Sequence, residues 1–142
     1  MVVTTTAAAT PDPAVATTDD SQVALRQLLS AVSTAKAQLA QYQQDLDAIC
    51  GGFESKQCWT ALRYSQTVGT EVTDTLGRVS QRPAEVADLW NSTFGTGVAL
   101  MSLDAGWCAP GRAFNDCYSH VFGTVQRLTQ QFAGWDPYLA RQ

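Results

Sequence analysis

A motif that occurs twice constrains this chain more than any other feature of its sequence, because it contains all four cysteines. The first copy runs from Leu46 to Trp59 and the second from Leu103 to Tyr118. In each copy a Leu-Asp-Ala segment leads to a cysteine, a short loop with glycine follows, and a second cysteine with an aromatic neighbour opens the next helical pattern. The repeat therefore predicts two helical hairpins, each with a cysteine on either side of its turn.

Four cysteines allow three pairings, and the spacing favours the local one. This pairing joins Cys50 to Cys58 and Cys108 to Cys117, so that each disulfide closes one turn. A structural zinc site is the alternative, but its cysteine pairs stand about two to four residues apart, closer than either pair here. We therefore expect disulfides and no metal. Disulfides in turn predict an extracytoplasmic location, either periplasmic or secreted.

Apolar side chains recur at alternating steps of three and four residues, which is typical of helices that pack along a seam. The pattern is strongest between Leu25 and Ile49, and Asp19 is the expected N-cap of that helix. Four helices are expected, at about residues 19–50, 58–80, 83–106 and 118–135. Two glycines at 95 and 97 predict a kink or an interruption in the third. The expected fold is all-α, either an antiparallel four-helix bundle or two stacked helical hairpins, with each hairpin tip closed by a local disulfide.

Composition divides the chain into three segments. Residues 1–18 are rich in Thr, Ala and Pro and are expected to form a disordered leader, left after removal of a secretion signal. The helical domain is expected at 19–136 and a C-terminal tail at 137–142. No stretch approaches the roughly 20 apolar residues of a membrane span. Nine basic and thirteen acidic residues give a net charge of −4, and the basic ones are scattered, so nucleic-acid binding is not expected.

Aromatic residues gather around the cysteines. They are Phe53, Trp59, Trp107, Phe114 and Tyr118. In one interpretation these rings cover the disulfides and seal one end of the bundle. In the other they form a patch that a partner protein or an apolar ligand contacts. Both hairpin tips of an up-down bundle lie at the same end, so the two sets of rings are expected to form one surface.

No catalytic constellation stands out in the sequence. His120 is the only histidine and is expected to be partly exposed, beside the seam of its helix. Ser33 and Lys36 fit a Ser-x-x-Lys pattern without its companion motifs, and Asn91-Ser92-Thr93 fits the glycosylation sequon inside a predicted helix. We therefore expect neither an enzymatic activity nor a cofactor.

A non-enzymatic binding module that mediates protein–protein interaction is the expected function. Its contact surface would be the Gln-rich face of the first helix, at residues 38–45, or the aromatic tip. The long Gln-rich helix resembles the minor pilus subunits of conjugative type IV secretion systems, although the paired cysteines are not part of that pattern. The resemblance implies a place in a cell-surface or secretion assembly. The alternative is a carrier that holds a lipid, haem or a similar apolar ligand in a bundle cavity.

Overall fold

The computed structural model describes residues 13–141, and every regular element in that range is helical. This confirms the all-α prediction. The helices are, in chain order, α1 (Pro13–Cys50), α2 (Lys56–Arg63), α3 (Ser65–Gly77), α4 (Ala84–Ser102), α5 (Phe114–Ala133) and α6 (Asp136–Leu139). Across these residues we find no helix whose length and apolar content would suit a membrane crossing.

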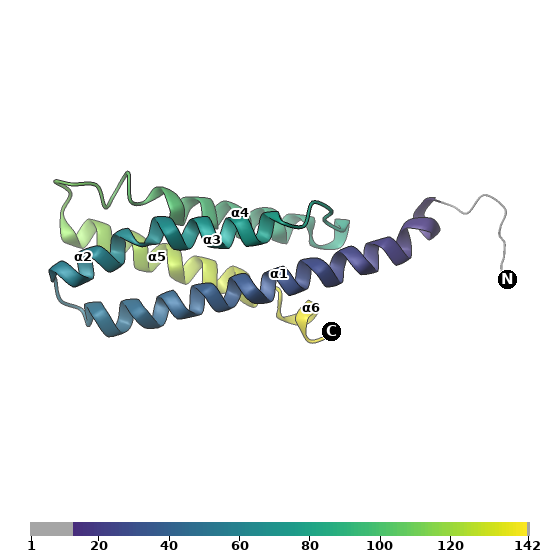
Figure 1. Ribbon diagram of the computed structural model, residues 1–142, viewed down its shortest axis with the longest axis horizontal. Helices are drawn as coiled ribbons and strands as arrows, with labels where there is room; N and C mark the ends of the chain where they lie inside the picture. Colours follow the sequence, from purple (N-terminus) through teal and green to yellow (C-terminus); the bar gives the residue numbers. More distant parts are fainter. Residues whose placement is uncertain (1–12, 142) are drawn as a thin grey trace.

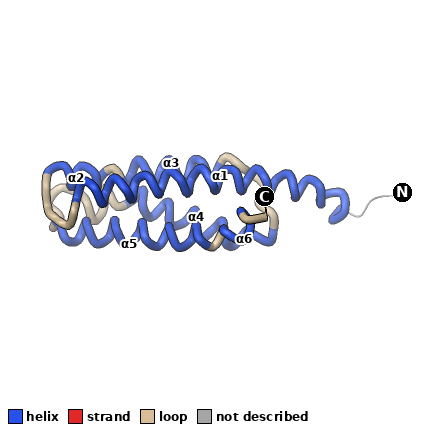
Figure 2. The backbone as a smooth tube through the Cα atoms, turned by 90° about the horizontal axis from the view of Figure 1, so that it is seen from below, coloured by secondary structure: helices blue, strands red, loops and turns tan. Residues whose placement is uncertain are grey.

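Four of the helices, α1, α3, α4 and α5, lie side by side along the long axis of the molecule (Figure 1). The short helix α2 continues into α3, and α6 is a single turn beside α1. Seen from below, the tube of Figure 2 shows the same lengthwise arrangement of helices joined by short loops. Contacts run from α1 to α3, from α3 to α4, from α4 to α5 and from α5 back to α1, so the four helices surround one core.

The seam of α1 enters that core as its periodicity predicts. Its buried side chains include Leu28, Val32, Ala35, Leu39, Tyr42 and Leu46. The start of the helix differs from the prediction, because α1 begins at Pro13 and Asp19 is therefore an interior residue rather than the N-cap. Proline suits the first turn of a helix, where its missing N–H would have no partner. The predicted leader lies partly outside the described residues, and its residues 13–18 belong to α1.

The second predicted helix is divided at Tyr64 into α2 and α3. Ser55 caps α2 by accepting a hydrogen bond from the Cys58 backbone N–H at 2.9 Å. At the division, the Tyr42 hydroxyl of α1 donates to the carbonyl oxygens of Ala61 at 2.7 Å and Leu62 at 3.4 Å. The Tyr42 hydroxyl thus bonds to backbone carbonyls in the last turn of α2, just before the division. Because this contact comes from a different helix, no local pattern in the sequence predicts the division.

The two glycines do not interrupt the third helix, because α4 is continuous from Ala84 to Ser102. Its glycine at 97 serves close packing instead, because a Cβ there would lie 2.9 Å from the Thr73 Cγ2 atom of α3. Gly69 of α3 approaches α4 in the same way, and a Cβ there would collide with the backbone of Met101. Helix packing at these two points offsets the low intrinsic helix propensity of glycine.

The last elements follow the predicted stop signal. Helix α5 ends at Ala133 with Gly134 as its cap residue. Trp135 then turns into the core, fully buried, and its indole Nε1–H donates to the Thr93 Oγ1 atom of α4 at 3.1 Å. The single turn α6 contains the first part of the predicted tail, while residue 142 lies outside the described range.

Candidate functional site

One disulfide connects the two cysteines within each copy of the motif, Cys50 to Cys58 in the first and Cys108 to Cys117 in the second. All four cysteines are buried. The loops that they close, between α1 and α2 and between α4 and α5, lie at the same end of the molecule (Figure 1). We call this end the disulfide end. Two disulfides indicate folding in an oxidising environment.

Glycines allow the sharp turns at the disulfide end. Gly51, Gly52 and Gly111 have φ values of 52°, 86° and 89°. Side chains with a Cβ rarely adopt this left-handed region, so glycine is required where the chain reverses so tightly. The Phe53 N–H then donates to the Cys50 carbonyl at 2.8 Å, which fixes the direction of the first loop.

Three of the five predicted site residues pack against one another. Trp59 meets Phe114 edge to face, with ring centroids 5.6 Å apart, and Phe114 contacts Tyr118 at 5.5 Å. Phe122, which the sequence analysis does not single out, extends the row by stacking on Tyr118 at 4.3 Å. All four rings are partly buried against the core. The row joins the two copies of the motif, because Trp59 belongs to the first copy, Phe114 and Tyr118 belong to the second, and Phe122 follows the second.

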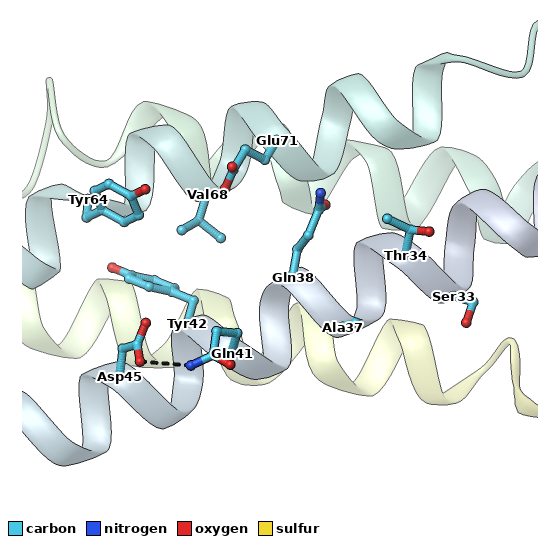
Figure 3. Close-up of a pocket in the computed structure, with 10 residues that line it drawn as sticks. All are labelled: Ser33, Thr34, Ala37, Gln38, Gln41, Tyr42, Asp45, Tyr64, Val68 and Glu71. Atoms are coloured by element: carbon cyan, nitrogen blue, oxygen red, sulfur yellow. Dashed lines mark hydrogen bonds between the residues drawn. The ribbon is translucent and has the colours of Figure 1, made fainter.

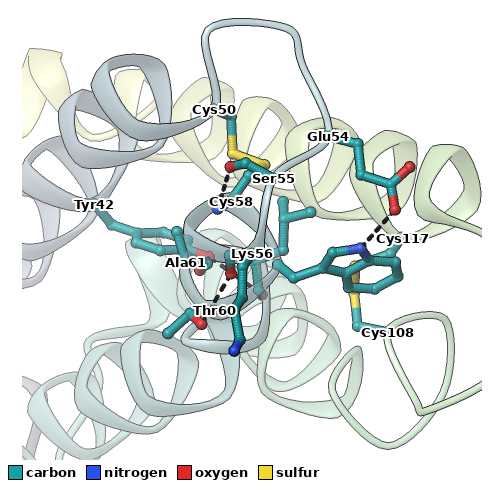
Figure 4. Close-up of a disulfide and its surroundings, with 12 residues drawn as sticks. Tyr42, Cys50, Glu54, Ser55, Lys56, Cys58, Thr60, Ala61, Cys108 and Cys117 are labelled. Carbon is teal, nitrogen blue, oxygen red and sulfur yellow. Dashed lines mark hydrogen bonds between the residues drawn. A yellow bond between two sulfur atoms is a disulfide. The ribbon is translucent and has the colours of Figure 1, made fainter.

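Polar groups hold Trp59 in this position. Its Nε1–H donates to the Glu54 carboxylate at 2.9 Å, as Figure 4 shows beside the two disulfides. Arg63 places its guanidinium 4.9 Å from the centre of the same indole ring. The Nε–H of Arg63 also donates to the Cys108 carbonyl at 3.2 Å, which connects the end of α2 to the second disulfide.

The remaining two predicted site residues face solvent. Trp107 is 36% exposed, the Arg112 guanidinium lies 4.7 Å from the centre of its ring, and the His120 ring stacks on it with centroids 3.8 Å apart. The His120 Nδ1 atom is 2.8 Å from the Asp116 carbonyl oxygen, so this nitrogen carries the proton and donates. Phe53 is 77% exposed, the largest exposed fraction of any large apolar side chain in the described part of the chain.

A surface groove runs between α1 on one side and α2 and α3 on the other, and the sequence analysis does not predict it. It consists of two adjoining hollows of about 640 and 380 Å³, which share Tyr42, Asp45 and Tyr64. We call it the α1–α3 groove; Figure 3 shows its larger part. The Gln-rich face of α1 supplies Gln38 and Gln41 to it. The helical periodicity identifies Tyr42 as a core residue, whereas nothing in the sequence marks Tyr64 as its partner.

Burial changes the chemistry of one group in this groove. The Tyr42 side chain is almost fully buried, and desolvation raises the pKa of its phenol well above the ordinary tyrosine value. The neutral hydroxyl therefore donates stably to the Ala61 carbonyl. Tyr42 is thus fixed as one wall of the groove.

Comparison of the chain with protein-family models, curated proteins and solved structures finds no match in any of the three. Within residues 13–141, no three histidine, cysteine or acidic side chains come together as candidate metal ligands. The surfaces just described are therefore the basis for a functional assignment.

Proposed function

We propose that this chain is an extracytoplasmic, non-enzymatic binding module that contacts a partner protein with its disulfide end. In this proposal the helices form two stacked antiparallel hairpins, and each disulfide closes one hairpin tip. A periplasmic or secreted location fits the two disulfides. A role within a cell-surface or secretion assembly is consistent with such a module.

The exposure of Phe53 is the observation that carries this proposal. A phenyl ring that is 77% exposed gains little burial in the isolated chain, although the loop that presents it is closed by a disulfide and a backbone hydrogen bond. Aromatic anchors on rigid loops are typical of binding hot spots, since little conformational entropy is lost on association. Trp107 on the second loop, which contacts Arg112 and His120, provides another exposed ring at the same end.

The carrier hypothesis has less support from the packing of the helices. The seam side chains of α1, α3, α4 and α5 meet at the centre of the bundle, and they include Leu28, Leu76, Leu100 and Leu128, all fully buried. The hollows described above lie at the surface between helices. An interior site for a lipid or haem would require these seams to separate.

Site-specific photo-crosslinking tests the binding module. A benzophenone amino acid replaces Phe53 in one variant and Val23 in a matched control, because Val23 is an exposed apolar residue of α1 distant from the disulfide end. In the cells that make the protein, we expect a discrete adduct from position 53 that mass spectrometry identifies as one partner protein. Equal labelling from both positions, or none from position 53, would contradict the proposal.

A further inference from the structure

The α1–α3 groove has aromatic walls of a defined geometry. The rings of Tyr42 and Tyr64 have centroids 6.3 Å apart and planes inclined at 47°. Tyr42 cannot turn away without losing its hydrogen bond to Ala61, while Tyr64 is 51% exposed toward solvent. The buried ring of Tyr42 thus backs the accessible ring of Tyr64, and the face of such an accessible ring attracts cations.

Carboxylates stand on both sides of these rings. Asp45 projects from α1 and Glu71 from α3, as Figure 3 shows. Asp45 accepts one hydrogen bond, from the Gln41 Nε2–H at 3.0 Å. Among the residues that line the two hollows there is no lysine or arginine. A groove with two acidic groups and no basic one concentrates a negative potential, which favours a positively charged occupant.

Elsewhere on its surface the chain meets aromatic rings with arginine. The guanidinium carbons of four arginines lie 3.8–4.9 Å from ring centroids, in the pairs Arg63–Trp59, Arg82–Trp90, Arg112–Trp107 and Arg141–Tyr138. The α1–α3 groove also has an exposed aromatic ring, that of Tyr64, together with two carboxylates. None of the residues that line the groove is an arginine or lysine that could pair with this ring.

From this complementarity we propose that the α1–α3 groove binds an arginine side chain presented by a segment of a partner protein. The planar guanidinium would lie on Tyr64 and bond to Asp45, which suits arginine better than the compact, strongly hydrated ammonium of lysine. Glu71, about two helical turns further along α3, adds to the negative potential of the groove. The adjoining hollow is bordered by Ile49, an exposed apolar residue, and by Ala61, so it accommodates an apolar neighbour of that arginine. An open, elongated groove suits a chain segment, whereas small ligands are mostly enclosed. This site is separate from the Phe53 loop and is independent of the proposal made for it.

An NMR titration of the ¹⁵N-labelled full chain tests the site. The probe is a short acetylated, amidated peptide of sequence Leu-Arg-Leu, and its control has citrulline, the neutral isostere, in place of arginine. We expect saturable amide shifts at Asp45, Tyr64 and Glu71 with a dissociation constant on the order of 1 mM. Added salt weakens the binding, because the carboxylates contribute through charge. The citrulline peptide is expected to bind about tenfold more weakly.

Matched variants locate the effect. Combined Asp45→Asn and Glu71→Gln substitutions are expected to weaken the arginine peptide about three- to tenfold. The controls Asp47→Asn and Asp74→Asn lie on the same two helices outside the groove lining and are expected to leave binding unchanged.

Four results would overturn the proposal: no saturable shift at the groove, equal binding of the citrulline peptide, equal loss in the control variants, or shifts confined to the Phe53 loop. Groove shifts that grow with protein concentration in the absence of peptide would identify a second copy of this chain as the occupant, and would overturn the assignment to a separate partner.

Discussion

At the scale of single residues, Tyr42 connects three parts of the molecule, because it lies on the seam of α1, bonds to the end of α2 and walls the α1–α3 groove. Replacing it by phenylalanine keeps the ring but leaves the Ala61 carbonyl without its donor. We expect Tyr42→Phe to lower the free energy of unfolding by about 1–2 kcal/mol. Urea denaturation of both proteins measures this difference, and equal stabilities would show that the hydrogen bond contributes nothing net.

The raised pKa of Tyr42 makes this difference depend on pH. Because the phenol stays neutral in the folded state, its contribution to stability is complete below about pH 10, the ordinary pKa of tyrosine. Above that pH the unfolded chain ionises first, and the wild type should lose about 1.4 kcal/mol per pH unit relative to Tyr42→Phe. The same denaturation series, carried from neutral pH to about pH 11, checks this sign. A stability difference that stays constant with pH would contradict it.

Gly69 tests the close approach of α3 and α4. A methyl group at this position would collide with the Met101 backbone, which cannot move without shifting α4. We expect Gly69→Ala to destabilise the protein by about 1–3 kcal/mol. Gly123→Ala on α5 is the matched control, since a Cβ there meets no atom within 4 Å, and it is expected to stabilise by up to about 1 kcal/mol. Thermal unfolding measures both variants. A lower melting temperature for Gly69→Ala and a higher one for Gly123→Ala would support this assignment, and similar shifts in both variants would contradict it.

At the scale of elements, the two disulfide loops are nearly equivalent, with sequence separations of 8 and 9 between their cysteines. Loop-closure entropy then assigns each disulfide about 2.5 kcal/mol of stabilisation. We expect the double variant Cys50→Ala/Cys58→Ala and the corresponding variant of Cys108 and Cys117 to lose similar amounts while remaining helical by circular dichroism. A large loss from one pair and none from the other would show that strain or packing, rather than loop entropy, dominates.

The elements also show what the sequence can predict. The seam of α1 was predictable, because a repeat of apolar residues at steps of three and four marks a buried face, and Leu28 to Leu46 are buried accordingly. The end of that seam was not predictable in the same way. Ile49 is 45% exposed, and Cys50 is buried instead because it forms the disulfide. The division at Tyr64 and the continuity of α4 through Gly97 depend on contacts with neighbouring helices. For the same reason the α1–α3 groove, formed by three helices together, had no signature in the sequence.

At the scale of the whole molecule, α1 extends beyond the other helices at the end opposite the disulfides (Figure 1). Residues 20–23 are exposed, and from residue 20 onward the first buried side chain is Ala24. A helical segment without tertiary packing opens more readily than one in the core. We expect backbone amides at 21–23 to exchange with deuterium at least about tenfold faster than those at 32–46, which corresponds to about 1.4 kcal/mol of local stability. Uniform protection along α1 would mean that a second molecule covers this end.

The placement of the two disulfides also determines how the chain responds to a protease. A cut inside either disulfide loop leaves the fragments covalently joined until a reductant is added, because a cystine spans the nick. The connection between α3 and α4, where Arg78 is exposed, has no such bond across it. Trypsin cleavage after Arg78 would divide the chain into two halves with no covalent link, one containing α1 to α3 and the other α4 to α6, each with its own cystine. Only the packing between these halves would then keep the nicked molecule together.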